Sequence, residues 1–88
     1  SNLRLGFSKI HDLGVFAKEK IERGANLGMS HAKIGSRIIR TPLGGFLNHS
    51  ETPNAFILKQ VNFREMIAIR DIKAGDEITV YYTEYKVN

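Results

Sequence analysis

The chain has 88 residues, with 13 basic and 9 acidic side chains, a net charge of +4 and no cysteine. This length predicts a single domain, residues 1–88, and the missing cysteines exclude disulfides, thiolate zinc sites and a cysteine nucleophile. The three histidines lack metal-ligand spacing, so we expect no bound metal. No apolar run approaches the ~20 residues of a membrane helix, and no N-terminal apolar segment resembles a signal peptide. These features predict an intracellular protein, cytoplasmic or nuclear.

The excess of basic residues would favour acidic partners. Nucleic acid is not expected as the direct target, because no aromatic residues are interleaved with a basic face. The window of residues 28–48 contains no acidic residue but three basic ones, Lys33, Arg37 and Arg40. We interpret this window as a solvated loop, with a contact to a phosphate or an acidic peptide as the alternative.

The first third of the chain is typical of short strands joined by turns. Polar and apolar residues alternate over residues 2–7, which predicts a half-buried edge strand. Residues 11–14 are typical of a turn, in which Gly14 would need a positive φ or a close backbone approach. A second short strand is expected to begin at residues 15–17, and a third to cover residues 25–29.

Residues 30–43 are the least regular part of the chain. Their apolar residues lie near helical spacing, which predicts a short helix containing Ile34, Ile38, Ile39 and Leu43. Residues 41–42, Thr-Pro, would end this helix or begin another turn.

The second half of the chain predicts a β-hairpin. Its two apolar strands are residues 55–59 and 65–69, and residues 60–63 form the turn between them. Asn62 in this turn can adopt a positive φ. A last strand is expected over residues 77–82.

One spacing pattern occurs twice in the chain. The pattern Ala-x-x-x-Ile-x-x-Gly-x-x-[Leu/Ile] covers residues 17–27 and again residues 68–78. Each copy is typical of strand, turn and strand, with the isoleucine filling the core and the glycine turning the chain. The repeat is too short for a solenoid and predicts two similar β-corners packed together. The whole chain therefore predicts a small, irregular, mostly β fold with little helix.

The least ordinary segment is residues 44–54. Asn48, His49 and Ser50 place an amide, an imidazole and a hydroxyl in consecutive positions, ahead of Pro53. Such a cluster suits a buried loop in which every polar group has a partner, but a plain surface turn has a similar composition. This segment alone leaves a functional site and a turn equally open.

Three segments together resemble the signature motifs of the SET-domain protein lysine methyltransferases. They are residues 14–24, which begin Gly-Val-Phe-Ala, residues 48–54, Asn-His-Ser-x-x-Pro-Asn, and residues 75–82, Gly-Asp-Glu-Ile-Thr-x-x-Tyr. They occur in that family's order and span nearly the whole chain. The resemblance implies a minimal SET domain, similar to the small viral or bacterial members. That fold is a β-clip of several short strands whose C-terminal segment threads through a loop as a pseudoknot.

The resemblance implies transfer of methyl groups from S-adenosylmethionine to a lysine side chain of a protein substrate, with a histone as one candidate. By position, Tyr82 matches the family's catalytic tyrosine and also borders the cofactor. Asn48 and His49 match the pair that binds the cofactor. Leu13 and Gly14 match the loop whose backbone contacts it.

Three more residues near the C-terminus are expected at the site. Val80 and Tyr81 would lie at the substrate channel, where the small Val80 would leave room for more than one methyl group. Tyr81 points to the other face of its strand, so packing is its alternative role. Tyr85 could stack on the adenine ring of the cofactor, with packing again as the alternative.

Departures from the family's pattern support a second hypothesis. Asp12 stands where the family usually has glycine, and residues 27–30 replace a tyrosine usually found after the first corner. The insert before Asn48 is short, and the chain has no cysteine-rich zinc segment. The alternative is therefore a catalytically inactive SET-like protein-binding module, ahead of a sugar-binding domain of the β-clip or SAF type. Small SET proteins without the zinc segment can complete the channel with a second copy, which predicts a homodimer.

Overall fold

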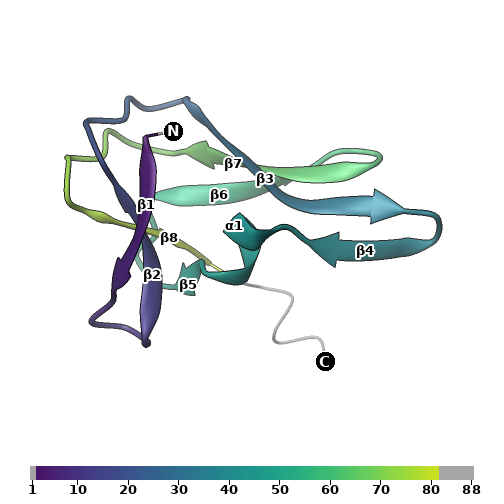
Figure 1. The fold of residues 1–88 in the computed structure, drawn as a ribbon. Helices are drawn as coiled ribbons and strands as arrows, with labels where there is room; N and C mark the ends of the chain where they lie inside the picture. The colour runs from purple at the N-terminus through teal and green to yellow at the C-terminus, as the bar shows by residue number, and fades with distance from the viewer. Residues whose placement is uncertain (1, 82–88) are drawn as a thin grey trace.

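A computed structural model describes residues 2–81, so Tyr82 and Tyr85 lie outside the described residues. The described chain forms two four-stranded sheets and one helical turn (Figure 1). The first sheet has the strand order β1-β2-β8-β5 and the second β4-β3-β7-β6. The mostly β prediction is confirmed. The elements are β1 (Leu3–Phe7), β2 (Leu13–Ala17), β3 (Asn26–Ile34), β4 (Arg37–Arg40), α1 (Pro42–Gly45), β5 (Asn48–His49), β6 (Ala55–Lys59), β7 (Phe63–Ala68) and β8 (Glu77–Val80).

The predicted hairpin is confirmed as β6 and β7. The pairing runs from Ala55 opposite Ala68 to Lys59 opposite Arg64. The prediction of a positive φ at Asn62 was wrong, since Asp12 is the only described non-glycine residue with a positive φ. The carbonyl of Asn62 instead accepts a hydrogen bond of 2.7 Å from the backbone of β3, which holds this turn against the neighbouring strand.

The helix expected in residues 30–43 was wrong for most of its length. β3 and β4 form a hairpin there, with the turn at Gly35, whose φ of 63° is accessible to glycine at little cost. Ile38 lies opposite Lys33 in this hairpin and is 54% exposed. Helical spacing of the isoleucines was therefore accidental, because no core face gathers them. Helix appears only after Thr41, as the single turn α1.

The two repeated patterns form two β-corners that pack against each other, as predicted. Ile21 and Ile72 exchange a pair of backbone hydrogen bonds of 2.8 Å and are 2% and 1% exposed. Gly24 and Gly75 turn the chain with nearly equal φ values of 89° and 90°. The amide of each glycine donates a 2.8 Å hydrogen bond to the alanine that begins the other copy. The repeat thus creates a local twofold arrangement at the centre of the fold.

The core collects residues from both sheets and both corners, and it leaves the outer edge strand partly uncovered. Leu3 packs against this core, but Leu5 and Phe7 are 51% and 90% exposed. The predicted half-burial of this strand was therefore wrong for its second half, because β1 packs mainly on β2 and extends past the core. The buried apolar residues are Val15, Ala17, Ile21, Leu47, Ala55, Met66, Ala68, Ile72, Ile78 and Val80.

Candidate functional site

The segment that holds Asn48 begins where α1 packs closely on β3. Thr41 caps this helical turn, since its hydroxyl accepts a 3.2 Å hydrogen bond from the amide of Gly44 and donates one of 2.5 Å to the carbonyl of Met29. A Cβ added to Gly44 would lie 2.1 Å from the carbonyl oxygen of Ser30, so only glycine permits this approach. The chain therefore leaves α1 in a defined direction and enters β5 at Asn48.

β5 and β8 form a short parallel pair that places two of the motif segments side by side (Figure 1). Asn48 lies opposite Thr79, and His49 lies opposite Val80. Tyr81 follows at the end of β8, where its ring centroid is 4.7 Å from that of His49. A parallel pair needs a long connection between its strands, so this neighbourhood arises only in the folded chain.

Asn54 fixes β8 from the side opposite β5. It is buried, and its amide nitrogen donates a 2.8 Å hydrogen bond to the carbonyl of Glu77. Its amide oxygen accepts one of 2.9 Å from the backbone amide of Thr79. The last asparagine of the loop motif is therefore a structural clamp on the strand that carries the C-terminal motif.

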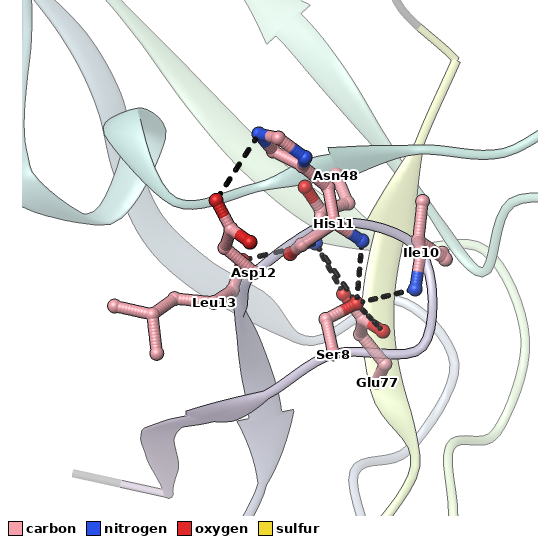
Figure 2. Close-up of polar contacts among 7 residues, drawn as sticks. All are labelled: Ser8, Ile10, His11, Asp12, Leu13, Asn48 and Glu77. Carbon is pink, nitrogen blue, oxygen red and sulfur yellow. Dashed lines mark hydrogen bonds and ion pairs between the residues drawn. The ribbon is translucent and has the colours of Figure 1, made fainter.

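The side-chain amide of Asn48 lies at the junction of three chain segments (Figure 2). Its nitrogen donates to Oε2 of Glu77 at 2.7 Å and lies 3.1 Å from Oγ of Ser8. The carbonyl oxygens of Leu13 and His11 are 3.1 and 3.4 Å from the same nitrogen. The Ser8 hydroxyl in turn donates a 2.7 Å hydrogen bond to Oε1 of Glu77. The β1–β2 loop, β5 and β8 thus meet at one polar cluster.

Gly14 makes the close approach that the sequence suggested, but it does so without a positive φ. An added Cβ would lie 2.2 Å from Oε2 of Glu77 and 3.1 Å from the amide nitrogen of Asn48. The positive φ of this loop, 23°, belongs instead to Asp12. Asp adopts this region more readily than most residues, so it fits a position at which the SET-domain family usually has glycine.

The other expected site residues lie around this cluster. His49 is partly exposed, and its Nε2 is 2.8 Å from Oε2 of Glu51. Val80 is fully buried in the core, whereas Tyr81 is 37% exposed beside the imidazole. Leu13 contributes its carbonyl to the polar cluster while its side chain is 38% exposed.

Two residues of the polar cluster had been given no role from the sequence. Glu77 is part of the C-terminal motif, residues 75–82, and its place in that motif was the available signal. Ser8 carried no signal at all, because its partner lies 69 residues away along the chain.

Within residues 2–81, no group of three or more His, Cys, Asp or Glu side chains could hold a metal ion. No helix in the same residues is long and apolar enough to cross a membrane.

The sequence model of the SET domain family matches residues 29–83. The chain belongs to the SET domain family. Its fold is similar to that of a Plasmodium falciparum candidate histone methyltransferase, with a TM-score of 0.80, 22% identity and 93% of both chains covered. It is also similar to the methyltransferase domain of human PR domain-containing protein 2, with a TM-score of 0.74 and 18% identity. That match covers 93% of this chain and 77% of the human domain.

No curated protein matches the chain in sequence. At the identities of the solved structures, the likeness establishes the fold of SET-domain methyltransferases. The predicted SET-like β-clip architecture of short strands is therefore confirmed.

Proposed function

We propose that the chain is an S-adenosylmethionine-dependent protein-lysine N-methyltransferase. The observation that supports this most is the convergence of three motif segments on Asn48. Its amide contacts the loop before Gly14, lies in β5 next to His49, and reaches Glu77 at the start of β8. Membership of the SET family and the fold support the assignment as a methyltransferase. The position of these residues supports the proposal that it uses S-adenosylmethionine and acts on a lysine.

The polar cluster suits the methionine end of the proposed cofactor. The oxygen of the Asn48 amide makes no hydrogen bond within residues 2–81, while no buried side-chain polar atom there lacks a partner. This oxygen therefore reaches the surface of the site, where it can accept a hydrogen bond from a protonated amine. The backbone of Leu13 and Gly14 would border the same group, and His49 and Tyr85 would lie towards the adenine.

When bound, S-adenosylmethionine supplies an electrophilic methyl group, so the protein need only bind and align the two reactants. The substrate lysine attacks as the neutral amine, although its usual pKa is about 10.4. Apolar surroundings lower the pKa of such an amine, because they disfavour its charged form. We propose that the Tyr82 hydroxyl orients this amine, and that Val80 and Tyr81 border its channel.

Binding of the cofactor is the direct test. Calorimetric titration of S-adenosylmethionine into the wild type should give micromolar binding, and Asn48→Ala should weaken it at least about tenfold. Asn62→Ala, at the exposed tip of the β6–β7 hairpin, is the matched control and should bind as the wild type does. Far-UV circular dichroism of each variant checks that it is folded.

Transfer activity is tested separately, with a labelled methyl group and lysine-containing proteins, histones among them. Tyr82→Phe should fold and bind the cofactor but lose turnover. A well-folded wild type that binds no cofactor up to millimolar concentration would instead favour the catalytically inactive, protein-binding SET-like module.

A homodimer remains a prediction from the resemblance to small SET proteins that complete their channel with a second copy. Light scattering should give twice the chain mass at working concentration. A monomer mass under the conditions of measurable turnover would contradict it.

A further inference from the structure

The polar contacts of the candidate site converge on the carboxylate of Glu77. One oxygen, Oε1, accepts the hydroxyl of Ser8, and the other, Oε2, accepts the amide of Asn48, both at 2.7 Å (Figure 2). Distances this short are typical of hydrogen bonds to an ionised carboxylate. A single side chain of β8 therefore holds both the β1–β2 loop and β5.

The atoms around Asn48 decide which end of its amide faces inward. The inward end lies within 3.4 Å of four oxygens: Oε2 of Glu77, Oγ of Ser8 and the carbonyls of His11 and Leu13. The Ser8 hydroxyl uses its one proton on Glu77, so its oxygen is an acceptor towards the amide. An amide oxygen at this place would face four acceptors without a proton between them. The nitrogen must therefore point inward, and the oxygen must point away from these four acceptors.

The same carboxylate stabilises the loop that borders the site. Oγ of Ser8 accepts hydrogen bonds from the backbone amides of Ile10 at 2.9 Å and His11 at 3.4 Å. The backbone amide of Ser8 donates a 3.0 Å bond to the carbonyl of Asp12, which closes the turn. Because Glu77 holds the Ser8 side chain, it also places the loop carbonyls that surround the Asn48 amide.

We propose that Glu77 is a positioning residue, whose carboxylate keeps the amide oxygen of Asn48 facing the cofactor site and keeps the loop of residues 8–12 against that amide. The inference rests on the proposed function, because it assigns the cofactor to Asn48. Gly14 supports it independently, since the missing side chain there leaves the space that Oε2 occupies.

The substitution Glu77→Gln tests this role with almost no change in shape. Glutamine offers one oxygen and one nitrogen, so either Ser8 or Asn48 loses its acceptor, and the Asn48 amide can turn round. Binding of S-adenosylmethionine should weaken about tenfold, the effect of one lost hydrogen bond to a charged group. Glu19→Gln removes the same charge at an exposed position and should leave the affinity unchanged.

A second readout needs no cofactor and reports on Asn48 alone. In nuclear magnetic resonance spectra, the side-chain amide protons of Asn48, assigned by their absence in Asn48→Ala, should exchange slowly with water in the wild type. They should shift and exchange faster in Glu77→Gln, and remain as in the wild type in Glu19→Gln. A role in stability alone would lower the unfolding midpoint without this selective change at one amide.

The two readouts separate the two proposals. If the Asn48 amide protons are protected in the wild type and exchange faster in Glu77→Gln, the orienting contact is supported. If the wild type at the same time binds no S-adenosylmethionine, the proposed cofactor role of the site is overturned. Unchanged affinity and unchanged Asn48 resonances in a folded Glu77→Gln would overturn the positioning role. If that variant does not fold, Ser8→Ala removes one anchor of the carboxylate and should shift the same resonances. Unchanged resonances in Ser8→Ala would then overturn the proposal.

Discussion

Alanine at position 14 should displace the carboxylate of Glu77 from its partners. Gly14 has no positive φ, so the backbone accepts alanine and the obstacle is the added methyl group. That Cβ would lie 2.2 Å from Oε2 of Glu77, whereas ordinary van der Waals contact begins at 3.4 Å. The carboxylate must retreat by about 1.2 Å, the difference between these distances. Its 2.7 Å hydrogen bonds to Ser8 and Asn48 would then be too long to hold.

The expected cost follows from those two hydrogen bonds. A hydrogen bond to a charged group contributes about 1.5–3 kcal/mol, and the lower end applies here because Glu77 is only partly buried. Alanine recovers about 0.4–1 kcal/mol by restricting the unfolded chain. We therefore expect Gly14→Ala to lower the free energy of unfolding by about 2 kcal/mol. Each kcal/mol lost should lower Tm by about 4–8 °C.

Urea denaturation followed by circular dichroism measures this change, and a double-mutant cycle identifies its cause. In a Glu77→Ala background the carboxylate is absent, so Gly14→Ala should cost little or nothing. Gly45→Ala is the matched control, because no atom lies within 4 Å of its Cβ position and its φ is not positive. Equal losses from Gly14→Ala with and without the Glu77 carboxylate would refute the reasoning, as would a variant as stable as the wild type.

Two further predictions concern other glycines. Gly24→Ala and Gly75→Ala should each lose about 1–2 kcal/mol of unfolding free energy in urea denaturation, because both have a left-handed φ and neither Cβ would touch another atom. The two losses should agree, and a difference above about 1 kcal/mol would contradict the equivalence of the corners. Gly44→Ala should cost more, at least about 3 kcal/mol, because its Cβ would meet the backbone of Ser30. A thermal midpoint within a few degrees of the wild type would show that α1 can move away from β3.

Much of the architecture could be predicted from the sequence wherever short-range spacing decides the chain path. The two β-corners follow from an isoleucine and a glycine at set distances, since the glycine alone permits the turn and the isoleucine must be buried. The β6–β7 hairpin follows from two apolar runs joined by a short polar turn. The motif residues Asn48, His49 and Gly14 were likewise recognisable by residue type and order.

The spacing of apolar residues predicted the wrong element where the same residues fit two periodicities. The isoleucines of residues 34–39 match a helix and a hairpin equally well. The hairpin forms because Gly35 turns the chain and β3 pairs with β7 on its other edge. The burial of β1 could not be predicted from the sequence either. Alternation of polar and apolar residues identifies the apolar face of a strand, but it does not show whether another layer covers that face.

The site itself is a product of the tertiary structure. The parallel pairing of β5 with β8, and the meeting of Ser8 with Glu77 across 69 residues, depend on how the two corners stack and bring distant segments of the chain together. The sequence determined which side chains could act and which local turns could form, because these depend on residue type and neighbours along the chain. Only the folded chain decided which of them share hydrogen bonds, because those contacts join segments that no local spacing relates.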